Sequence, residues 1–207
     1  AGEPFPAQRV DMDHAAFLWT LASTFFAGLA LFVQKVVAEE RRSSAFNGFL
    51  MYGLSGVLAA VLLIGLQELP EEWLPIIFFG LVAGGVHGLG NFIRIESLKH
   101  IDSVLFFPIH KMLGPLLVVV GGVAVFADHL SVTQYVGIGL SLTVPLLLVS
   151  SVEHQRQKNL SLGLKLLVIS TILSAGSMLL SKQGLLYGSA VLLMLCSSQI
   201  AGTIASA

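Results

Sequence analysis

The amino-acid sequence predicts an all-α polytopic membrane protein, built as a five-helix bundle repeat followed by the start of a second, inverted repeat. Of the 207 residues, 55% are hydrophobic and only 11% are charged, and the mean hydropathy is +0.86. Soluble domains carry about 25% charged residues, so this composition indicates a membrane protein. The segment 23–35 also recurs in outline at 170–182, and both copies begin with Ser-Thr and end with Lys. Five apolar segments lie in one repeat unit, and an odd number of crossings inverts the next copy.

The apolar runs predict about seven transmembrane helices. Six runs carry no charge, and a seventh, 103–127, contains Lys111. All but 166–181 reach the roughly 17 to 25 residues that a spanning helix needs, and that run lengthens if its flanking lysines snorkel. The last two runs are parted by Lys182 and a turn-like stretch, so they could also form one long helix. The seven runs are 15–33, 45–66, 73–93, 103–127, 130–152, 166–181 and 183–207.

Local signals mark where these elements begin. Asn47 and Ser103 suit the N-caps of the second and fourth segments, and Ser131 begins the fifth. Pro70 and Pro75 bracket the turn into the third segment. We expect the prolines inside the fourth and fifth segments to kink those helices, and these are Pro108, Pro115 and Pro145.

The charges between the segments predict how the chain is oriented. Lys111 lies inside a segment, and the basic residues Arg9 and Lys182 belong to one side of the membrane. By the positive-inside rule, the side with most of the basic residues is cytoplasmic, which places the N-terminus outside a plasma (inner) membrane. The remaining basic residues all follow the first, third or fifth segment: Lys35, Arg41, Arg42, Arg94, Lys99, Arg156, Lys158 and Lys165.

We therefore expect four parts along the chain. Residues 1–14 form a polar N-terminal segment without a signal peptide, and 15–152 form the first five-helix repeat. Residues 153–165 form a cytoplasmic connection, and 166–207 begin the second repeat. The sequence starts without Met and stops within an apolar run, so we expect both ends to be truncated.

The net charge, the single cysteine and the absence of catalytic motifs argue against several classes of function. A net charge of -1 gives no basic field for nucleic acid, and the one cysteine, Cys196, indicates neither a disulfide nor a metal site. We expect no cofactor. The sequence contains no His-Glu-x-x-His, no paired intramembrane aspartates and no Gly-x-Ser-x-Gly, so an enzyme is not predicted. A retinal pigment would need a lysine in its last helix, and 183–207 has none. A receptor-like or structural membrane protein stays open as the alternative to a transporter.

The repeated segment carries a face of small and polar residues in each copy. In the first copy the face has Ser23 and Gln34 at its two ends, with alanines between them. Such a face either packs closely against another helix or lines a hydrated cavity. Because both copies show it in register, we favour a shared central cavity. In the second copy the face is a complete serine stripe, formed by Ser170, Ser174, Ser177 and Ser181.

The third segment carries two distinct faces. One has glycines four residues apart, a small-xxx-small groove for close helix contact, formed by Gly80, Gly84 and Gly88. The neighbouring face carries His87, Asn91 and Arg94. We interpret Arg94 as an interfacial anchor. Polar groups at the depth of His87 and Asn91 face protein or water rather than lipid, so both are candidates for the substrate path.

In the fourth segment, Lys111 is the strongest single candidate for the substrate path, and His110 beside it is a further one. Eight residues from Ser103 place it roughly 12 Å into a core about 30 Å thick. An ammonium there costs about 3 kcal/mol unless it is paired, hydrated or deprotonated. Lys111 is interpreted as an anionic-substrate contact or a proton-coupling group, or as a structural tie to carbonyls that the flanking prolines free.

The stretch that follows resembles a known family. Pro115, Leu130, Ser131, Gln134 and Gly137 match the EamA-type drug/metabolite transporter pattern, in which a helix with a proline precedes a Gly-Glu-x-Leu-Ser-x-x-Gln-x-x-Gly segment. This sequence has Asp128 where the family usually has Glu, and Ala127 where it often has Gly. Lys111 and His87 are not motif positions.

The resemblance implies ten helices arranged as two inverted five-helix bundles around a central path. We therefore predict a secondary transporter that moves a small metabolite or drug-like solute by alternating access. Its partners are a small-molecule solute and the lipid bilayer. The path would be completed by a missing second half of the chain or by a second copy in a homodimer.

Overall fold

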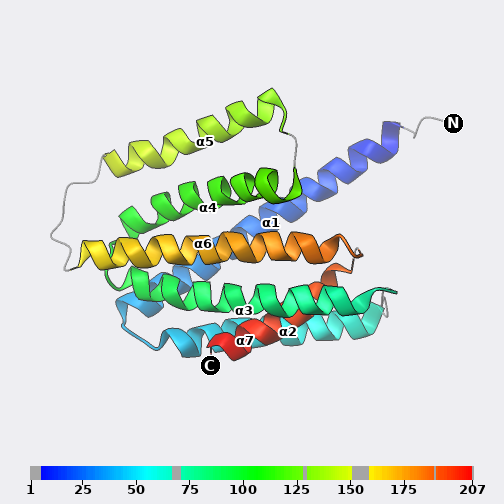
Figure 1. Ribbon diagram of the computed structural model, residues 1–207, viewed down its shortest axis with the longest axis horizontal. Helices are drawn as coiled ribbons and strands as arrows, with labels where there is room; N and C mark the ends of the chain where they lie inside the picture. The colour runs from blue at the N-terminus through cyan, green and yellow to red at the C-terminus, as the bar shows by residue number, and fades with distance from the viewer. Residues whose placement is uncertain (1–5, 67–70, 128–129, 151–158, 189, 207) are drawn as a thin grey trace. The chain divides into compact units, whose positions relative to one another are not determined.

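The computed structural model describes residues 6–66, 71–127, 130–150, 159–188 and 190–206, and every regular element in these ranges is a helix. The helices follow the order that the apolar runs predict (Figure 1). The all-α fold of a polytopic membrane protein is thereby confirmed. The helices are α1 (Pro6–Glu39), α2 (Ser44–Leu66), α3 (Trp73–Leu98), α4 (Ser103–Phe126), α5 (Val132–Ser150), α6 (Leu160–Leu185) and α7 (Val191–Ser206).

Five of these helices are long and apolar enough to cross a membrane. They are the whole of α3, α4 and α6 and the greater part of α1 and α2, and the spans contain 20 to 26 residues. Helix α7 is apolar but shorter. At 1.5 Å per residue, a 20-residue helix covers about 30 Å, which is the thickness of the hydrocarbon core.

Two expectations about where elements begin are corrected. Helix α2 begins at Ser44, so Asn47 lies inside the helix rather than at its cap. The N-cap of α4 is Asp102, whose carboxylate accepts a hydrogen bond from Val104 N at 3.2 Å. An aspartate is as good a cap as a serine, and its position one residue earlier satisfies the first free N–H groups of the helix.

The last two apolar runs form two helices rather than one. Helix α6 ends at Leu185 and α7 begins at Val191. Helix α6 also extends well beyond the apolar run 166–181 and includes both Lys165 and Lys182. The helix is therefore long enough to span because it takes in its flanking lysines.

The chain forms two compact units, 1–36 and 37–207. The described part of the first unit is most of α1, a continuous helix with large exposed apolar side chains such as Phe25 and Phe26. Exposed apolar side chains are expected where a helix faces lipid.

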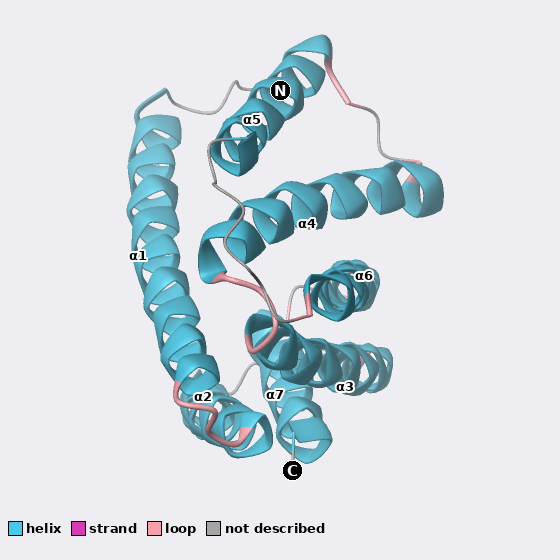
Figure 2. Cartoon of the chain, turned by 90° about the vertical axis from the view of Figure 1, so that its left-hand side faces the viewer, coloured by secondary structure: helices cyan, strands magenta, loops and turns pink. Residues whose placement is uncertain are grey.

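The second unit is organised around α3. Helix α3 packs against α6 and α7, α7 packs against α2, and α4 packs against α6 and α5. Figures 1 and 2 show α3 between α6 and α7 from two directions. Helices α2 and α7 run side by side but begin at opposite ends of the unit (Figure 1). An inverted repeat requires this relation between its second and seventh segments.

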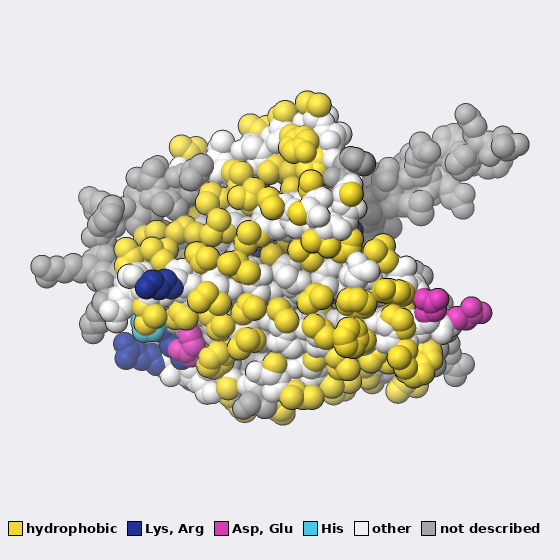
Figure 3. Space-filling view, in the orientation of Figure 1, with side chains coloured by type: hydrophobic (Ala, Val, Ile, Leu, Met, Phe, Trp, Pro, Cys, Tyr) yellow, Lys and Arg dark blue, Asp and Glu magenta, His cyan; other side chains and the backbone are white. Residues whose placement is uncertain are grey.

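Charged side chains gather at the two ends of the second unit, with a broad apolar surface between them (Figure 3). One end, where α3 finishes and α4 and α6 begin, carries Lys99 and Lys165, and we call it the basic end. The other, where α3 and α7 begin, carries Glu71 and Glu72, and we call it the acidic end. This distribution matches the charge partition that a bilayer imposes.

Two apolar clusters form the core of the second unit. The cluster toward the basic end contains Ile95, Phe106 and Leu167, and the one toward the acidic end contains Ile76 and Met194. Between them, α3 contributes polar side chains to the interior. We call this set the polar zone; it extends from the middle of α3 toward the basic end and consists of His87, Asn91, Arg94, Ser174 and Ser177.

Candidate functional site

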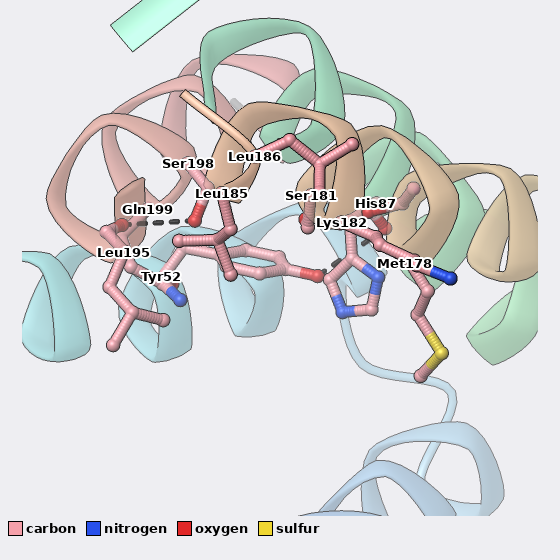
Figure 4. A pocket seen from close by; sticks show the side chains of 12 residues that line it. Tyr52, His87, Met178, Ser181, Lys182, Leu185, Leu186, Leu195, Ser198 and Gln199 are labelled. Carbon is pink, nitrogen blue, oxygen red and sulfur yellow. Dashed lines mark hydrogen bonds between the residues drawn. The ribbon is translucent and has the colours of Figure 1, made fainter. Parts of the chain in front are cut away.

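A cavity of about 580 Å³ lies among α2, α3, α6 and α7, beside the polar zone (Figure 4). It is large enough for a small organic molecule, because ligand pockets usually measure about 300 to 1,000 Å³. No Asp or Glu lies among its lining residues. These are Tyr52, Gly84, His87, Ser177, Met178, Ser181, Lys182, Leu185, Leu186, Leu195, Ser198 and Gln199.

The glycines of α3 determine how closely α7 approaches the cavity. A Cβ added at Gly84 would collide with backbone atoms of Ser198, and one at Gly88 would lie 2.9 Å from the Gly202 carbonyl oxygen. A Cβ added at Gly80 would instead overlap the side-chain hydroxyl of Ser197. The predicted small-xxx-small groove is confirmed, and its partner is α7. The groove holds α7 against α3 and brings residues near Ser198 to the cavity wall.

Tyr52 and His87 form one wall of the cavity. The two rings meet edge to face with centroids 5.9 Å apart, and Tyr52 Oη donates a long hydrogen bond of 3.4 Å to the His87 carbonyl oxygen. In Figure 4 the phenol of Tyr52 points toward His87. The sequence-predicted His87 therefore lies in the cavity wall.

The serine stripe of α6 lies partly between packed helices and partly in the cavity wall. Ser170, Ser174 and Ser177 are buried. Ser177 Oγ donates to the Ala83 carbonyl oxygen at 2.9 Å, which ties α6 to α3. Ser177 and Ser181 also line the cavity. One part of the stripe is a packing surface, and the part toward the acidic end faces the cavity.

Arg94 corrects an expectation from the sequence. An interfacial anchor would be exposed, whereas the Arg94 residue is only 8% exposed. Its Nη2 donates to Ser174 Oγ at 2.8 Å, and its Nε has no hydrogen-bond partner. Asn91, one turn earlier, is 3% exposed. Arg94 therefore belongs to the polar zone.

His110 and Lys111, adjacent in sequence, lie in different environments. His110 stacks on Phe106 with centroids 5.6 Å apart, and its Nδ1 lies 2.9 Å from Thr171 Oγ1 on α6. Lys111 is exposed on α4 and does not line the cavity. Helix α4 begins at Ser103. Lys111 therefore still lies eight residues into the helix, which is the distance from which its expected depth was calculated.

The remaining path candidates, Ser23 and Gln34, lie on α1. Ser23 Oγ donates to the Thr20 carbonyl oxygen at 2.9 Å, within its own helix. Gln34 lies near the end of the same helix. Both belong to the first unit, so their role in a path through the second unit stays a prediction.

The motif residues have a structural explanation at the start of α5. Gln134 Oε1 accepts from Ser131 N at 2.8 Å, and Gln134 N donates to Ser131 Oγ at 3.3 Å. This reciprocal pair is a capping box, which satisfies free N–H groups at a helix N-terminus. Pro115 lies within α4, Gly137 lies within α5, and Asp128 falls outside the described residues.

Several wall residues were not singled out from the sequence. Gln199 lies in α7, where its Oε1 accepts from Ser55 Oγ at 2.8 Å and so joins α7 to α2. Lys182 Nζ lies 4.4 Å from the centroid of the Phe126 ring. A polar residue in an apolar run was the signal that identified His87, and the same signal would have identified Gln199. Tyr52 gives no such signal, since tyrosine is common in membrane helices.

The described residues contain no group of three or more His, Cys, Asp or Glu side chains that could hold a metal ion. The side chains that line the cavity offer hydrogen bonding, cationic charge at Lys182 and apolar contact.

Comparison with known proteins identifies a family. The model of the EamA-like transporter family matches residues 14–151, about two thirds of the chain. The chain has no significant match among curated proteins or among solved structures.

Proposed function

Because the chain belongs to the EamA-like transporter family, we propose that it is a secondary transporter that moves a small metabolite or drug-like solute by alternating access, and that the cavity among α2, α3, α6 and α7 binds the solute. The observation that carries the proposal is the combination of a ligand-sized cavity with polar side chains deep in membrane-spanning helices. Such groups are costly in lipid and mark solute pathways.

The depth of the cavity supports this role. His87 lies 14 residues after Trp73, which is roughly 21 Å along α3 at 1.5 Å per residue. This position is close to the middle of the 26-residue helix. Solute sites of secondary transporters lie near the bilayer midplane, between repeats.

The basic end is closed by hydrogen bonds between helices. Glu96 on α3 accepts from Ser44 Oγ on α2 and from Lys99 Nζ, both at 2.6 Å. Ser97 Oγ donates to the Gly163 carbonyl oxygen on α6 at 2.8 Å. These contacts tie α2, α3 and α6 together on the side of the polar zone away from the cavity. They are the contacts that break when the path opens toward the basic end.

The proposal also covers the orientation of the chain in the membrane and the helices that complete the solute path. The basic end faces the cytoplasm and the N-terminus faces outward across the plasma (inner) membrane, in accord with the positive-inside rule. The first bundle comprises 15–152, and the second begins with α6 after the connection 153–165. Further helices, from a second half of the same protein or from a second copy of this chain, complete the path.

The test uses the full chain in proteoliposomes loaded with a mixture of small metabolites, whose loss is followed by mass spectrometry. We expect wild type to deplete a subset of solutes relative to empty liposomes. Ser181→Trp places a bulky ring in the cavity wall and should abolish that depletion. Ile172→Trp is the matched control, since Ile172 is 52% exposed on the same helix and should leave depletion unchanged. Wild-type liposomes that retain every solute as empty ones do would refute transport.

A further inference from the structure

Arg94 is the one charged residue among the buried side chains of the described residues. A guanidinium presents five N–H donors and does not lose its proton in proteins. Here it has one hydrogen bond, to the neutral hydroxyl of Ser174, and its buried Nε has none. A buried positive charge with so few partners is strongly unfavourable unless an anion balances it.

No carboxylate in the described part of the chain supplies that balance. The nearest in sequence, Glu96, is already bound by Ser44 and Lys99 at the basic end. The cavity wall contains no Asp or Glu. The positive charge of Arg94 therefore has no carboxylate partner in the described part of the chain.

The position of Arg94 connects it to the cavity. It lies seven residues after His87 on α3, roughly 10 Å toward the basic end. Its hydrogen-bond partner Ser174 is one helical turn from Ser177, which lines the cavity. Arg94 does not itself line the cavity, so its guanidinium reaches the wall through this contact with Ser174. An anion at this wall would lie within the attraction of the guanidinium.

The rest of the wall indicates the body of the ligand. Toward the acidic end most of its surface is formed by apolar side chains, namely Met178, Leu185, Leu186 and Leu195, and Lys182 adds a second positive charge to this wall. A ligand that fits both regions has an anionic head and an apolar body. Resting on the proposed transport function, we propose that the solute is an amphipathic monocarboxylate whose carboxylate is held at the polar zone by the charge of Arg94.

The experiment measures binding rather than transport, with the full chain in detergent. Benzoate is the probe, and benzamide and benzylamine are its neutral and cationic counterparts of similar shape. Ligand binding to the folded state raises the melting temperature. We expect benzoate to raise it in wild type, and neither counterpart to do so. Phenylacetate, indole-3-acetate and octanoate extend the carboxylate series.

Substitution then assigns the effect to Arg94. Arg94→Gln should weaken benzoate binding roughly tenfold or more, because a hydrogen bond or contact to a charged group is lost. Arg94→Lys should retain part of the affinity, since it keeps the charge. Arg42→Gln removes an exposed arginine at the basic end and should bind benzoate as wild type does.

Three outcomes would overturn the inference: equal binding of benzoate and benzamide by wild type, no binding of any of the four carboxylates, or undiminished binding by a folded Arg94→Gln. The wild-type comparison decides the matter even if Arg94→Gln does not fold. The experiments distinguish this inference from the proposed function. Proteoliposomes that deplete only neutral or cationic solutes would refute the inference that the solute is an anion, but would still demonstrate transport.

Discussion

The contact between α3 and α7 rests on glycines whose replacement has calculable consequences. In Gly84→Ala, the new methyl group would overlap backbone atoms of Ser198, which no side-chain rotation relieves. The two helices must separate, so the cost falls in the upper part of the roughly 1 to 3 kcal/mol typical of overpacking. At Gly88 the nearest atom, the Gly202 carbonyl oxygen, would lie 2.9 Å from the methyl, so the two helices must also shift, but by less than for Gly84→Ala. We expect Gly88→Ala to cost about 1 kcal/mol.

Gly85 provides the matched control. It lies next to Gly84 on the same helix, and a Cβ added there would meet no atom within 4 Å. Gly85→Ala should be neutral or stabilise the helix by up to about 1 kcal/mol, because alanine has the higher helix propensity. Thermal unfolding in detergent, followed by tryptophan fluorescence, should rank the melting temperatures as Gly85→Ala, wild type, Gly88→Ala and Gly84→Ala, from highest to lowest. If Gly84→Ala and Gly85→Ala melt together, the close α3–α7 contact is refuted.

Two further predictions concern the basic end and the start of α5. Glu96→Gln weakens the contacts with Ser44 and Lys99, and should lower stability by no more than about 1 kcal/mol because the side chains are partly exposed. It should also speed labelling of a cysteine placed at the buried Ser170, in a background without the native cysteine, and unchanged labelling would argue against a closure there. Ser131→Ala removes one half of the capping box with Gln134 and should cost roughly 1 kcal/mol, which thermal unfolding would detect. A melting temperature equal to that of wild type would contradict the capping role.

The helices and their order were predictable because membrane crossing leaves a strong one-dimensional signal. Apolar runs predicted every helix in the described residues, including α4, whose run contains the charged Lys111, and α6, whose run of 166–181 is short. The capping residues were less predictable, since Asp102 and Ser103 are both good caps and adjacent. Only the backbone conformation at that point distinguishes them.

The candidate site was predictable in part. His87 was identified from its depth in an apolar run, and it lies in the cavity wall. The burial of Arg94 was not predicted, because the sequence shows where a charge falls relative to an apolar run but not which face of another helix covers it. The cavity also depends on Tyr52 and Gln199, which come from helices far apart in the sequence.

The sequence by itself determined the class of protein, the number of apolar segments, the glycine face of α3 and the family motif, since each is encoded in composition or in the spacing of residues along one helix. Only the tertiary structure decided that the glycine face meets α7, that Ser177 and Ser181 face a cavity while Ser170 packs, and that Arg94 is buried. These outcomes depend on which faces of distant helices meet. The energy of such contacts is set by close packing, a property that no single segment contains.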